Sequence, residues 1–312
     1  MKRSHLAIAA FAAAAFAAST AGAQQLKLMT GPQGGSWYPL GGAIQSMAAD
    51  NLGVSIQVLP GGGVANVQGV QTGAADLGFA NSISTVDAVR GLPPFEGKAT
   101  NVCNLATLYP QYFQIVTRKD GGPSTVDGFK GMRLATQPVG NTAEQVTRAV
   151  LQAGGMTYDD MKGVDYVSYS DGVALMQDGN TDIFTLGTTV PASAIMDLAN
   201  STEIQLVSLT PEFMKKMKEE INPGYAPLTI KAGSYPGQDK DVLAIGYATH
   251  VIARCDLDAE VVTGILEQMW ENKADLAAIA KAMSNMSIEE MKLDIGVPLH
   301  EGAKAFYAKH GG

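Results

Sequence analysis

The segment TGPQGGSWYPLGGAIQSMAA (residues 30–49) connects two patterns of apolar residues through a loop rich in glycine and proline. Residues 26–29 before it read as a strand, and residues 38–51 carry apolar side chains at helical spacing. Such a loop ends at a helix N-terminus, where backbone N–H groups are unpaired and the helix dipole is positive. We therefore expect the loop to hold an anionic group, with Ser36 adding a hydroxyl.

The same step from strand to helix recurs along the chain. Further strand patterns alternate with helix patterns, which predicts an α/β fold. These strand patterns lie at residues 54–59, 76–80, 132–136, 164–169 and 182–186.

Two parts of the chain match in spacing. Ser36 lies 40 residues before Asp76, and Thr142 lies 40 residues before Asp182. Each aspartate closes a Gly-x-x-Asp step ahead of an apolar strand, so the match predicts two similar α/β lobes. A late strand pattern at residues 241–252 suits a crossover between the lobes, and an ordinary core strand of a single sheet is the alternative.

Three strand ends that run into helix starts supply the candidate binding site, because ligands of open α/β sheets lie beyond the carboxyl ends of strands. In the second loop, Thr142 and Gln145 form a capping-box pattern, and in the third, Pro191 is expected to open a helix. An ordinary helix cap has the same composition, but these loops recur at corresponding places in the two lobes. The candidates are Gly35, Ser36, Trp37, Tyr38, Gly140, Asn141, Thr142, Thr188, Thr189 and Pro191.

Aromatic residues beside these loops are candidates for packing against the carbon skeleton of a ligand. Trp37 and Tyr38 are neighbours in a predicted helix, so they cannot both face the cleft, and one of them is expected to line it. Tyr109 is a further candidate. The alternative for each of these aromatic residues is that it only covers the local hydrophobic core and does not contact a ligand.

Composition and motifs argue against several other classes of protein. The formal charge is −8 and no Lys/Arg cluster is present, which argues against nucleic acid as a partner. His250, His300 and His310 have no metal-ligand spacing. The first loop lacks the GK[ST] ending of a P-loop and the last glycine of a nucleophile elbow. No catalytic residue, metal or cofactor is therefore expected, and a serine hydrolase that uses Ser36 is the enzymatic alternative.

Residues 1–23 have the order of a secretory signal peptide: two basic residues, an apolar run and a small-residue cleavage pattern. Cleavage after Ala23 would release a periplasmic protein, and an uncleaved N-terminal anchor is the alternative. Cys103 and Cys255 are either a disulfide, which an oxidising compartment favours, or two buried thiols.

Several short motifs follow one another along nearly the whole chain after residue 23. They include TG at 30–31, YPLG at 38–41, GGG at 61–63, GAADLGF at 73–79, LYP at 108–110, FKG at 129–131 and PLHEGA at 298–303. In this order and spacing they resemble the TAXI branch of the solute receptors that serve tripartite ATP-independent periplasmic (TRAP) transporters.

The resemblance implies a two-lobed type II periplasmic binding fold with the ligand cleft at the hinge. We expect lobe 1 at residues 24–117 and 246–312 and lobe 2 at residues 118–245. By position, the resemblance adds Asn81 and Ser82 to the ligand loops.

Known members of the TAXI branch bind glutamate, glutamine or related dicarboxylates, and deliver them to a membrane permease of fused subunits. The chain departs from the pattern of this branch at Ser36–Trp37, at residues 81–83 and at residues 138–142, all in the expected cleft. The expected function is thus a periplasmic receptor for a small carboxylate such as glutamate, glutamine or 2-oxoglutarate. A receptor of an ABC importer for an oxyanion or a heterocycle is the nearest alternative.

Overall fold

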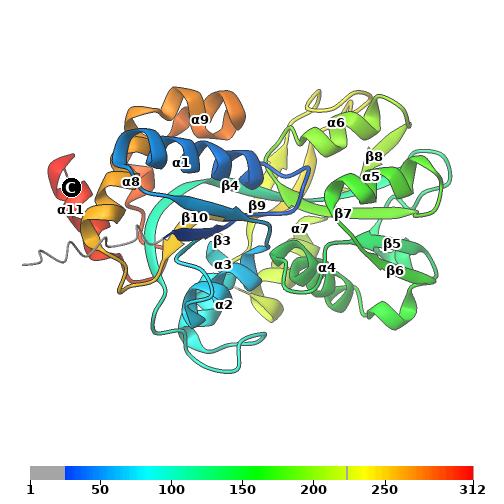
Figure 1. Ribbon diagram of the computed structural model, residues 1–312. Coiled ribbons are helices and arrows are strands. Elements are labelled where there is room, and N and C mark those ends of the chain that lie inside the picture. The colour runs from blue at the N-terminus through cyan, green and yellow to red at the C-terminus, as the bar shows by residue number, and fades with distance from the viewer. Residues whose placement is uncertain (1–24, 223, 312) are drawn as a thin grey trace, which may run out of the picture.

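The computed structural model describes residues 25–222 and 224–311 of the chain, and the predicted signal peptide at 1–23 lies outside them. These residues form an α/β protein of two lobes that share one sheet (Figure 1). The predicted α/β class is thereby confirmed. The strands are β1 (Leu26–Met29), β2 (Ile56–Leu59), β3 (Leu77–Asn81), β4 (Cys103–Arg118), β5 (Arg133–Thr136), β6 (Gly163–Tyr166), β7 (Ile183–Thr188), β8 (Ile204–Leu206), β9 (Ala226–Ile230) and β10 (Val242–Ala253).

Helices cover both faces of the sheet (Figure 1). The α-helices are α1 (Trp37–Leu52), α2 (Gly63–Thr72), α3 (Ser82–Arg90), α4 (Thr142–Ala153), α5 (Tyr169–Gln177), α6 (Ser193–Ala199), α7 (Pro211–Lys216), α8 (Ala259–Glu271), α9 (Lys273–Ile279), α10 (Ile288–Met291) and α11 (Glu301–Lys309). Shorter turns of 3-10 helix are η1 (Val126–Phe129), η2 (Tyr158–Asp160) and η4 (Lys281–Asn285), and η3 (Met217–Ile221) is a π-helical turn.

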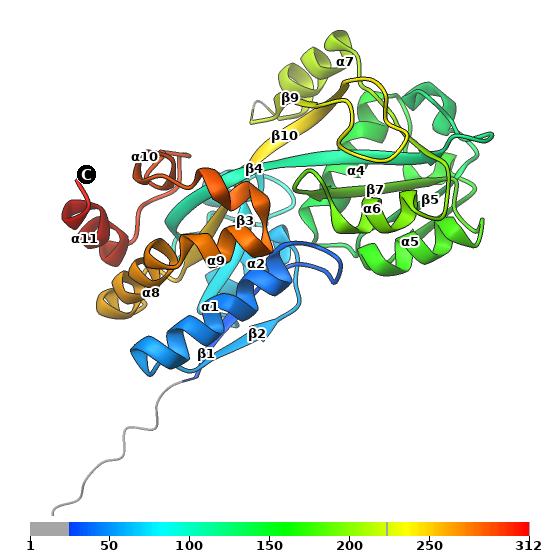
Figure 2. The same ribbon diagram turned by 90° about the horizontal axis from the view of Figure 1, so that it is seen from above.

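The strand order is β2-β1-β3-β10-β4-β7-β5-β6, with β8 and β9 added beside β4 and β10. Strand β10 pairs with β9 at its start and with β3 at its end, and it pairs with β4 from Ile245 to Ala253; all three pairings are antiparallel. These two long strands run together from one lobe to the other (Figure 2). The predicted late crossover strand is therefore confirmed.

The other crossover strand, β4, was not predicted. Pro110 lies within it, and proline is ordinarily confined to sheet edges, first positions and bulges. Here Pro110 pairs with Ala248 next to an irregularity in the β4–β10 register at Thr249 and His250. A strand with such an irregularity accommodates the proline.

The two lobes repeat one another in register. Leu28 pairs with Leu77 in the first lobe, and Leu134 pairs with Ile183 in the second, at the same separation along the chain. The two aspartates of the sequence match have the same role, because Asp76 Oδ2 accepts from the Lys27 N–H at 2.8 Å and Asp182 Oδ2 accepts from the Arg133 N–H at 2.9 Å. The predicted similarity of the lobes is confirmed.

Each lobe has buried hydrophobic clusters of its own. One large cluster joins β1, β3 and α1 to α8 and α11, which return from the end of the chain. The others include a cluster around α4 and β7 and one around α5 and α6. Because β4 and β10 contribute to both sides, the lobe limits of 24–117 with 246–312 and of 118–245 remain a proposal.

The two cysteines are bonded to each other. The Sγ atoms of Cys103 and Cys255 are 2.06 Å apart, and the bond joins the start of β4 to the chain just after β10. In the described residues no helix is both long and apolar enough to span a membrane.

Candidate functional site

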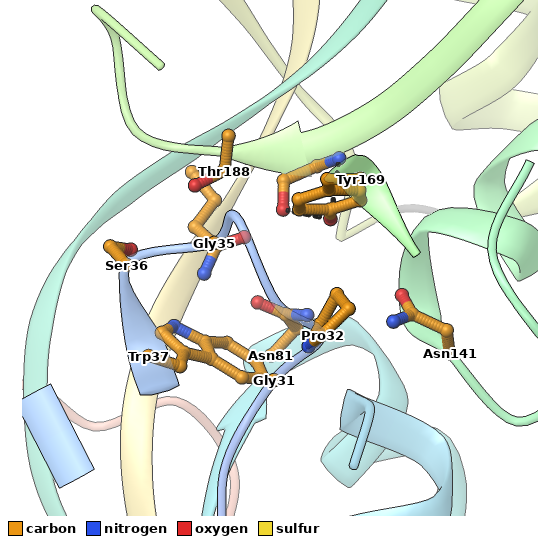
Figure 3. A pocket seen from close by; sticks show the side chains of 11 residues that line it. Gly31, Pro32, Gly35, Ser36, Trp37, Asn81, Asn141, Tyr169 and Thr188 are labelled. Atoms are coloured by element: carbon orange, nitrogen blue, oxygen red, sulfur yellow. Dashed lines mark hydrogen bonds between the residues drawn. The ribbon is translucent and has the colours of Figure 1, made fainter. Parts of the chain in front are cut away.

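A small cavity lies between the two lobes, at the hinge strands (Figure 3). Its volume is about 20 Å³, room for about one water molecule. The groups around it come from both lobes and from β4. They are Gly31, Pro32, Gly35, Ser36, Trp37, Asn81, Gln111, Asn141, Tyr169, Gly187 and Thr188.

The loop between β1 and α1 forms one wall of the cavity. Trp37, the first residue of α1, is buried and stacks on Phe79 with ring centroids 5.6 Å apart. Tyr38 is 40% exposed and does not line the cavity, so Trp37 is the aromatic residue of the pair that faces it. Ser36 precedes the helix without capping it, and its Oγ lies 3.3 Å from the Tyr109 hydroxyl.

The same loop passes close to the other lobe. Gly34 has a φ of 81°, in the left-handed region that favours glycine. A Cβ at Gly35 would lie 3.3 Å from the Tyr169 ring, tighter than ordinary contact. The oxygen of Gly34 also accepts a hydrogen bond from Ser193 Oγ at 3.1 Å. The glycines therefore allow the α1 loop to meet lobe 2.

Asn81 faces the cavity from the end of β3 (Figure 3). It is the N-cap residue of α3, but its side chain does not cap the helix. The side chain is only 3% exposed and its Oδ1 has no hydrogen-bond partner. A buried acceptor without a partner is costly in a folded protein, so this oxygen is available to a hydrogen-bond donor of a ligand.

Gln111, on β4, links the two walls. With its amide oriented to satisfy its neighbours, it accepts from Trp37 Nε1 at 2.7 Å and from Thr249 Oγ1 at 2.7 Å. It then donates to the Gly187 oxygen at 2.9 Å. The hinge strand thus connects the α1 tryptophan of lobe 1 to β7 of lobe 2.

The opposite wall comes from β7 and α5. The Tyr169 hydroxyl donates to the Gly187 oxygen at 2.9 Å and accepts from the Gly187 N–H at 3.1 Å. Burial raises the pKa of Tyr169 above its ordinary range, so its phenol is neutral at physiological pH. Thr188 completes this wall.

The start of α4 differs from its prediction. Asn141 is the N-cap residue and accepts from the Ala143 N–H at 2.9 Å, so the capping box assigned to Thr142 and Gln145 is wrong. Asn141 lines the cavity. Thr142 turns away from it, and its Oγ1 lies 2.9 Å from Ser84 Oγ. Asn141 caps the helix because Asn is at least as favourable an N-cap residue as Thr, and it precedes Thr142 by one position.

The third loop also differs in detail. Helix α6 begins at Ser193, with Ala192 as its N-cap residue, so the prediction that Pro191 opens the helix is wrong. The peptide bond before Pro191 is cis and its side chain is exposed. The backbone oxygen of Thr189 accepts from Gln114 Nε2 at 3.3 Å, and Thr189 does not line the cavity.

Of the predicted residues, the structure brings six together around the cavity: Gly35, Ser36, Trp37, Asn81, Asn141 and Thr188. Seven lie outside its lining: Tyr38, Ser82, Tyr109, Gly140, Thr142, Thr189 and Pro191. Tyr109 is buried behind Ser36, where desolvation raises its pKa to about 12. Ser82 Oγ accepts from the Ala248 N–H at 3.1 Å.

Sequence reasoning missed Gln111 and Tyr169. Gln111 follows Pro110 in the strand that was not predicted. Tyr169 begins a helix after Ser168, which accepts from the Asp171 N–H. That Ser-x-x-Asp cap is the one local signal that could have located the start of α5, and it says nothing about the cavity.

The cavity lining is polar but uncharged. None of its residues is Asp, Glu, Lys, Arg or His. The chemical resources are the hydroxyl of Ser36, the amides of Asn81 and Asn141, and the N-terminus of the 16-residue helix α1. Such groups can bind an anion without a counter-charge.

The histidines lie elsewhere. His250 is buried between Thr85 and Asn104, at 2.8 and 2.9 Å, and burial lowers its pKa to about 3, so it is neutral. His300 accepts from the Gly302 N–H at the start of α11. Within residues 25–222 and 224–311, neither is hydrogen-bonded to Ser36, and no group of three His, Cys, Asp or Glu side chains is placed to hold a metal.

Solved structures with the same architecture define the class of fold. A protein of Bordetella bronchiseptica RB50 is 17% identical, with 91% of this chain and 88% of that chain covered and a TM-score of 0.53. The substrate-binding protein of an amino acid ABC transporter is 14% identical (84% and 99% covered, TM-score 0.51). An ancestral arginine-binding protein bound to arginine is also 14% identical (84% and 98% covered, TM-score 0.50).

These likenesses establish the α/β type II periplasmic binding protein fold, as expected from the sequence. The family follows from the sequence itself. A model of the NMT1-like family matches residues 28–311, and the chain belongs to that family.

Proposed function

We propose that the protein is a periplasmic solute receptor that binds a small carboxylate between its lobes and delivers it to a TRAP-type membrane permease. One observation carries the proposal: the uncharged polar cavity at the hinge, where the α1 N-terminus, the Ser36 hydroxyl and the Asn81 side chain meet. The helix N-terminus and the Ser36 hydroxyl suit a carboxylate, whose charge the helix dipole and N–H groups stabilise. The unpartnered Asn81 Oδ1 is an acceptor and suits an N–H donor of the ligand, such as the ammonium group of an amino acid.

The ligands that fit best are glutamate, glutamine or a related dicarboxylate such as 2-oxoglutarate. The Trp37 ring supplies an apolar surface for the carbon skeleton, and the amides and hydroxyls supply hydrogen bonds. Because the cavity of about 20 Å³ is smaller than any of these molecules, the lobes must part along β4 and β10 to admit the ligand.

The location and the transporter type rest on sequence. Residues 1–23 have the pattern of a signal peptide, and the Cys103–Cys255 disulfide suits the oxidising periplasm. The motifs shared with TAXI receptors favour a permease of fused subunits. A neighbouring gene for such a permease would support this assignment, and one for an ATPase subunit would contradict it.

A thermal-shift screen of residues 24–312 tests the ligand class. We expect a carboxylate to raise the melting temperature, since a ligand at one hundred times its Kd adds about 2.7 kcal/mol of stability. The panel contains L-glutamate, L-glutamine, 2-oxoglutarate, sulfate, phosphate and cytosine. A shift with the inorganic anions or the heterocycle alone would favour an oxyanion or heterocycle importer instead.

A further inference from the structure

A second polar contact joins the lobes away from the cavity. Ser84, on α3 of lobe 1, is fully buried against α4 of lobe 2. Its Oγ lies 2.9 Å from Thr142 Oγ1 and donates to Gln145 Oε1 at 3.2 Å. Neither Ser84 nor Gln145 lines the cavity, so this contact does not depend on touching a ligand.

Asp87 extends the contact by one turn of α3. Its Oδ2 accepts from Gln145 Nε2 at 3.5 Å and from Asn222 Nδ2 at 3.3 Å, both from lobe 2. The Gln145 amide therefore uses its oxygen for Ser84 and its nitrogen for Asp87. Parting the lobes would separate all of these pairs together.

The helix starts beside this contact are built for close approach. The Ala65 N–H, in α2, donates to the Gly140 oxygen at 2.7 Å across the lobes. A Cβ at Gly62 or Gly63 would collide with Asn141 or Thr142. The glycines therefore allow α2 and α4 to meet end to end.

We propose that Ser84, Asp87 and Gln145 form an interlobe latch that stabilises the closed arrangement, and that the burial of Asp87, which is 7% exposed, makes closure depend on pH. The latch acts on closure itself. Only its effect on affinity rests on the proposed function, because a receptor that closes more readily binds its ligand more tightly.

The direction of the pH effect follows from the surroundings of Asp87. Burial raises the pKa of Asp87 to about 6, while the Gln145 hydrogen bond, the Arg90 charge and the Asn222 hydrogen bond act the other way. Opening the lobes would hydrate the carboxylate and lower its pKa. A proton therefore binds the closed state more tightly, and closure weakens as the pH rises through about 6.

Other ionisable groups share the groove beside the latch, which has a volume of about 710 Å³. Glu144 is paired with Arg148 at 2.6 Å, so their charges offset one another. Burial and the Asp87 charge raise the pKa of Tyr225 above its ordinary range, so it stays neutral near pH 6. Asp87 is thus the group expected to set the transition.

Distance measurements between spin labels test the latch without a ligand. Gln68→Cys and Gln152→Cys place labels on exposed positions of opposite lobes along the same groove, and the native cysteines are blocked by their disulfide. Double electron–electron resonance at pH 5 and pH 8 then reports the closed and open populations.

We expect a larger closed population at pH 5 than at pH 8 in the otherwise unchanged protein. Asp87→Asn should abolish this pH dependence and remain closed at pH 8. Ser84→Ala and Gln145→Ala each remove two interlobe hydrogen bonds and should lower the ratio of closed to open at least about fivefold, the effect of losing one. The controls, Ser46→Ala and Asp50→Asn on the exposed face of α1, should match the parent protein.

Identical distance distributions in the parent and in the three latch variants, or an undiminished pH dependence in Asp87→Asn, would overturn the proposal. A protein that shows the expected distances but binds no carboxylate would instead refute the proposed function and leave the latch intact.

Discussion

At the scale of single residues, the site depends on a few side chains whose hydrogen-bonding groups are held in place by neighbours outside the cavity. Trp37 is fixed by its stack on Phe79 and by its N–H to Gln111. Asn81 keeps an unpartnered oxygen in a buried position. We place the ligand here because this oxygen both lacks a partner and faces the cavity.

Trp37 should report ligand binding by its fluorescence. The chain has two tryptophans, and Trp270, on α8, does not line the cavity. A bound ligand should therefore change the emission of the parent protein and of Trp270→Phe, but leave Trp37→Phe unchanged. A ligand-dependent signal that survives in Trp37→Phe would place the ligand elsewhere.

At the scale of elements, much of the fold was readable from the sequence. The alternation of patterns located β1, β3, β5 and β7 to within a residue or two, and the equal spacing of Asp76 and Asp182 predicted the repeat. Helix starts were less accurate because Asn141 and Ser193 compete with Thr142 and Pro191 as local signals.

The rest of the fold and site could not be predicted because it depends on long-range pairing. Strand β4 carries a proline, which is accommodated close to an irregularity where Leu108 of β4 is an extra residue between the partners of Thr249 and His250. Gln111 and Tyr169 enter the cavity through that pairing and through the approach of the two lobes. Thr142 was predicted to face a ligand, yet its hydroxyl lies against that of Ser84, outside the cavity lining.

Asp182 should stabilise the second lobe at neutral pH. The guanidinium and the backbone N–H of Arg133 both donate to the Asp182 carboxylate, and these hydrogen bonds lower the pKa of Asp182. A lowered pKa gives stability that is present above the unfolded-state value, near 3.9, and is lost as the pH falls through the folded-state value. Asp182→Asn should therefore cost about 1–2 kcal/mol in urea unfolding at pH 7.

The same comparison repeated at low pH provides the check. The difference between Asp182→Asn and the parent protein should shrink as the pH falls below about 4, since the unfolded parent is protonated there before the folded one. A difference that stays constant between pH 7 and pH 3 would show that the ion pair with Arg133 is not its source.

At the scale of the whole molecule, two devices control how the lobes are joined. Strands β4 and β10 form the continuous hinge, and the disulfide between Cys103 and Cys255 closes a segment that contains all of lobe 2. The separation of 152 residues makes this a long loop. Bonds that close long loops restrict the unfolded chain most in the chain-entropy account.

Loss of the disulfide should therefore lower the free energy of unfolding by about 2–5 kcal/mol. Denaturant unfolding of the oxidised protein and of Cys103→Ser with Cys255→Ser measures the change, and a thiol assay of the unfolded parent should find no free thiol. Equal midpoints for the two proteins would show that the bond contributes nothing to stability.

The most direct test of the central claim, that an uncharged cavity at the hinge binds a carboxylate, is calorimetric titration of Asn81→Asp at pH 8. The parent protein should bind one equivalent of L-glutamate, L-glutamine or 2-oxoglutarate. Asn81→Asp places a negative charge beside the ligand carboxylate in a side chain of nearly the same size, and it should weaken that binding about 100-fold. The exposed control Asn200→Asp should leave the binding unchanged. Undiminished binding by a folded Asn81→Asp protein would contradict the account.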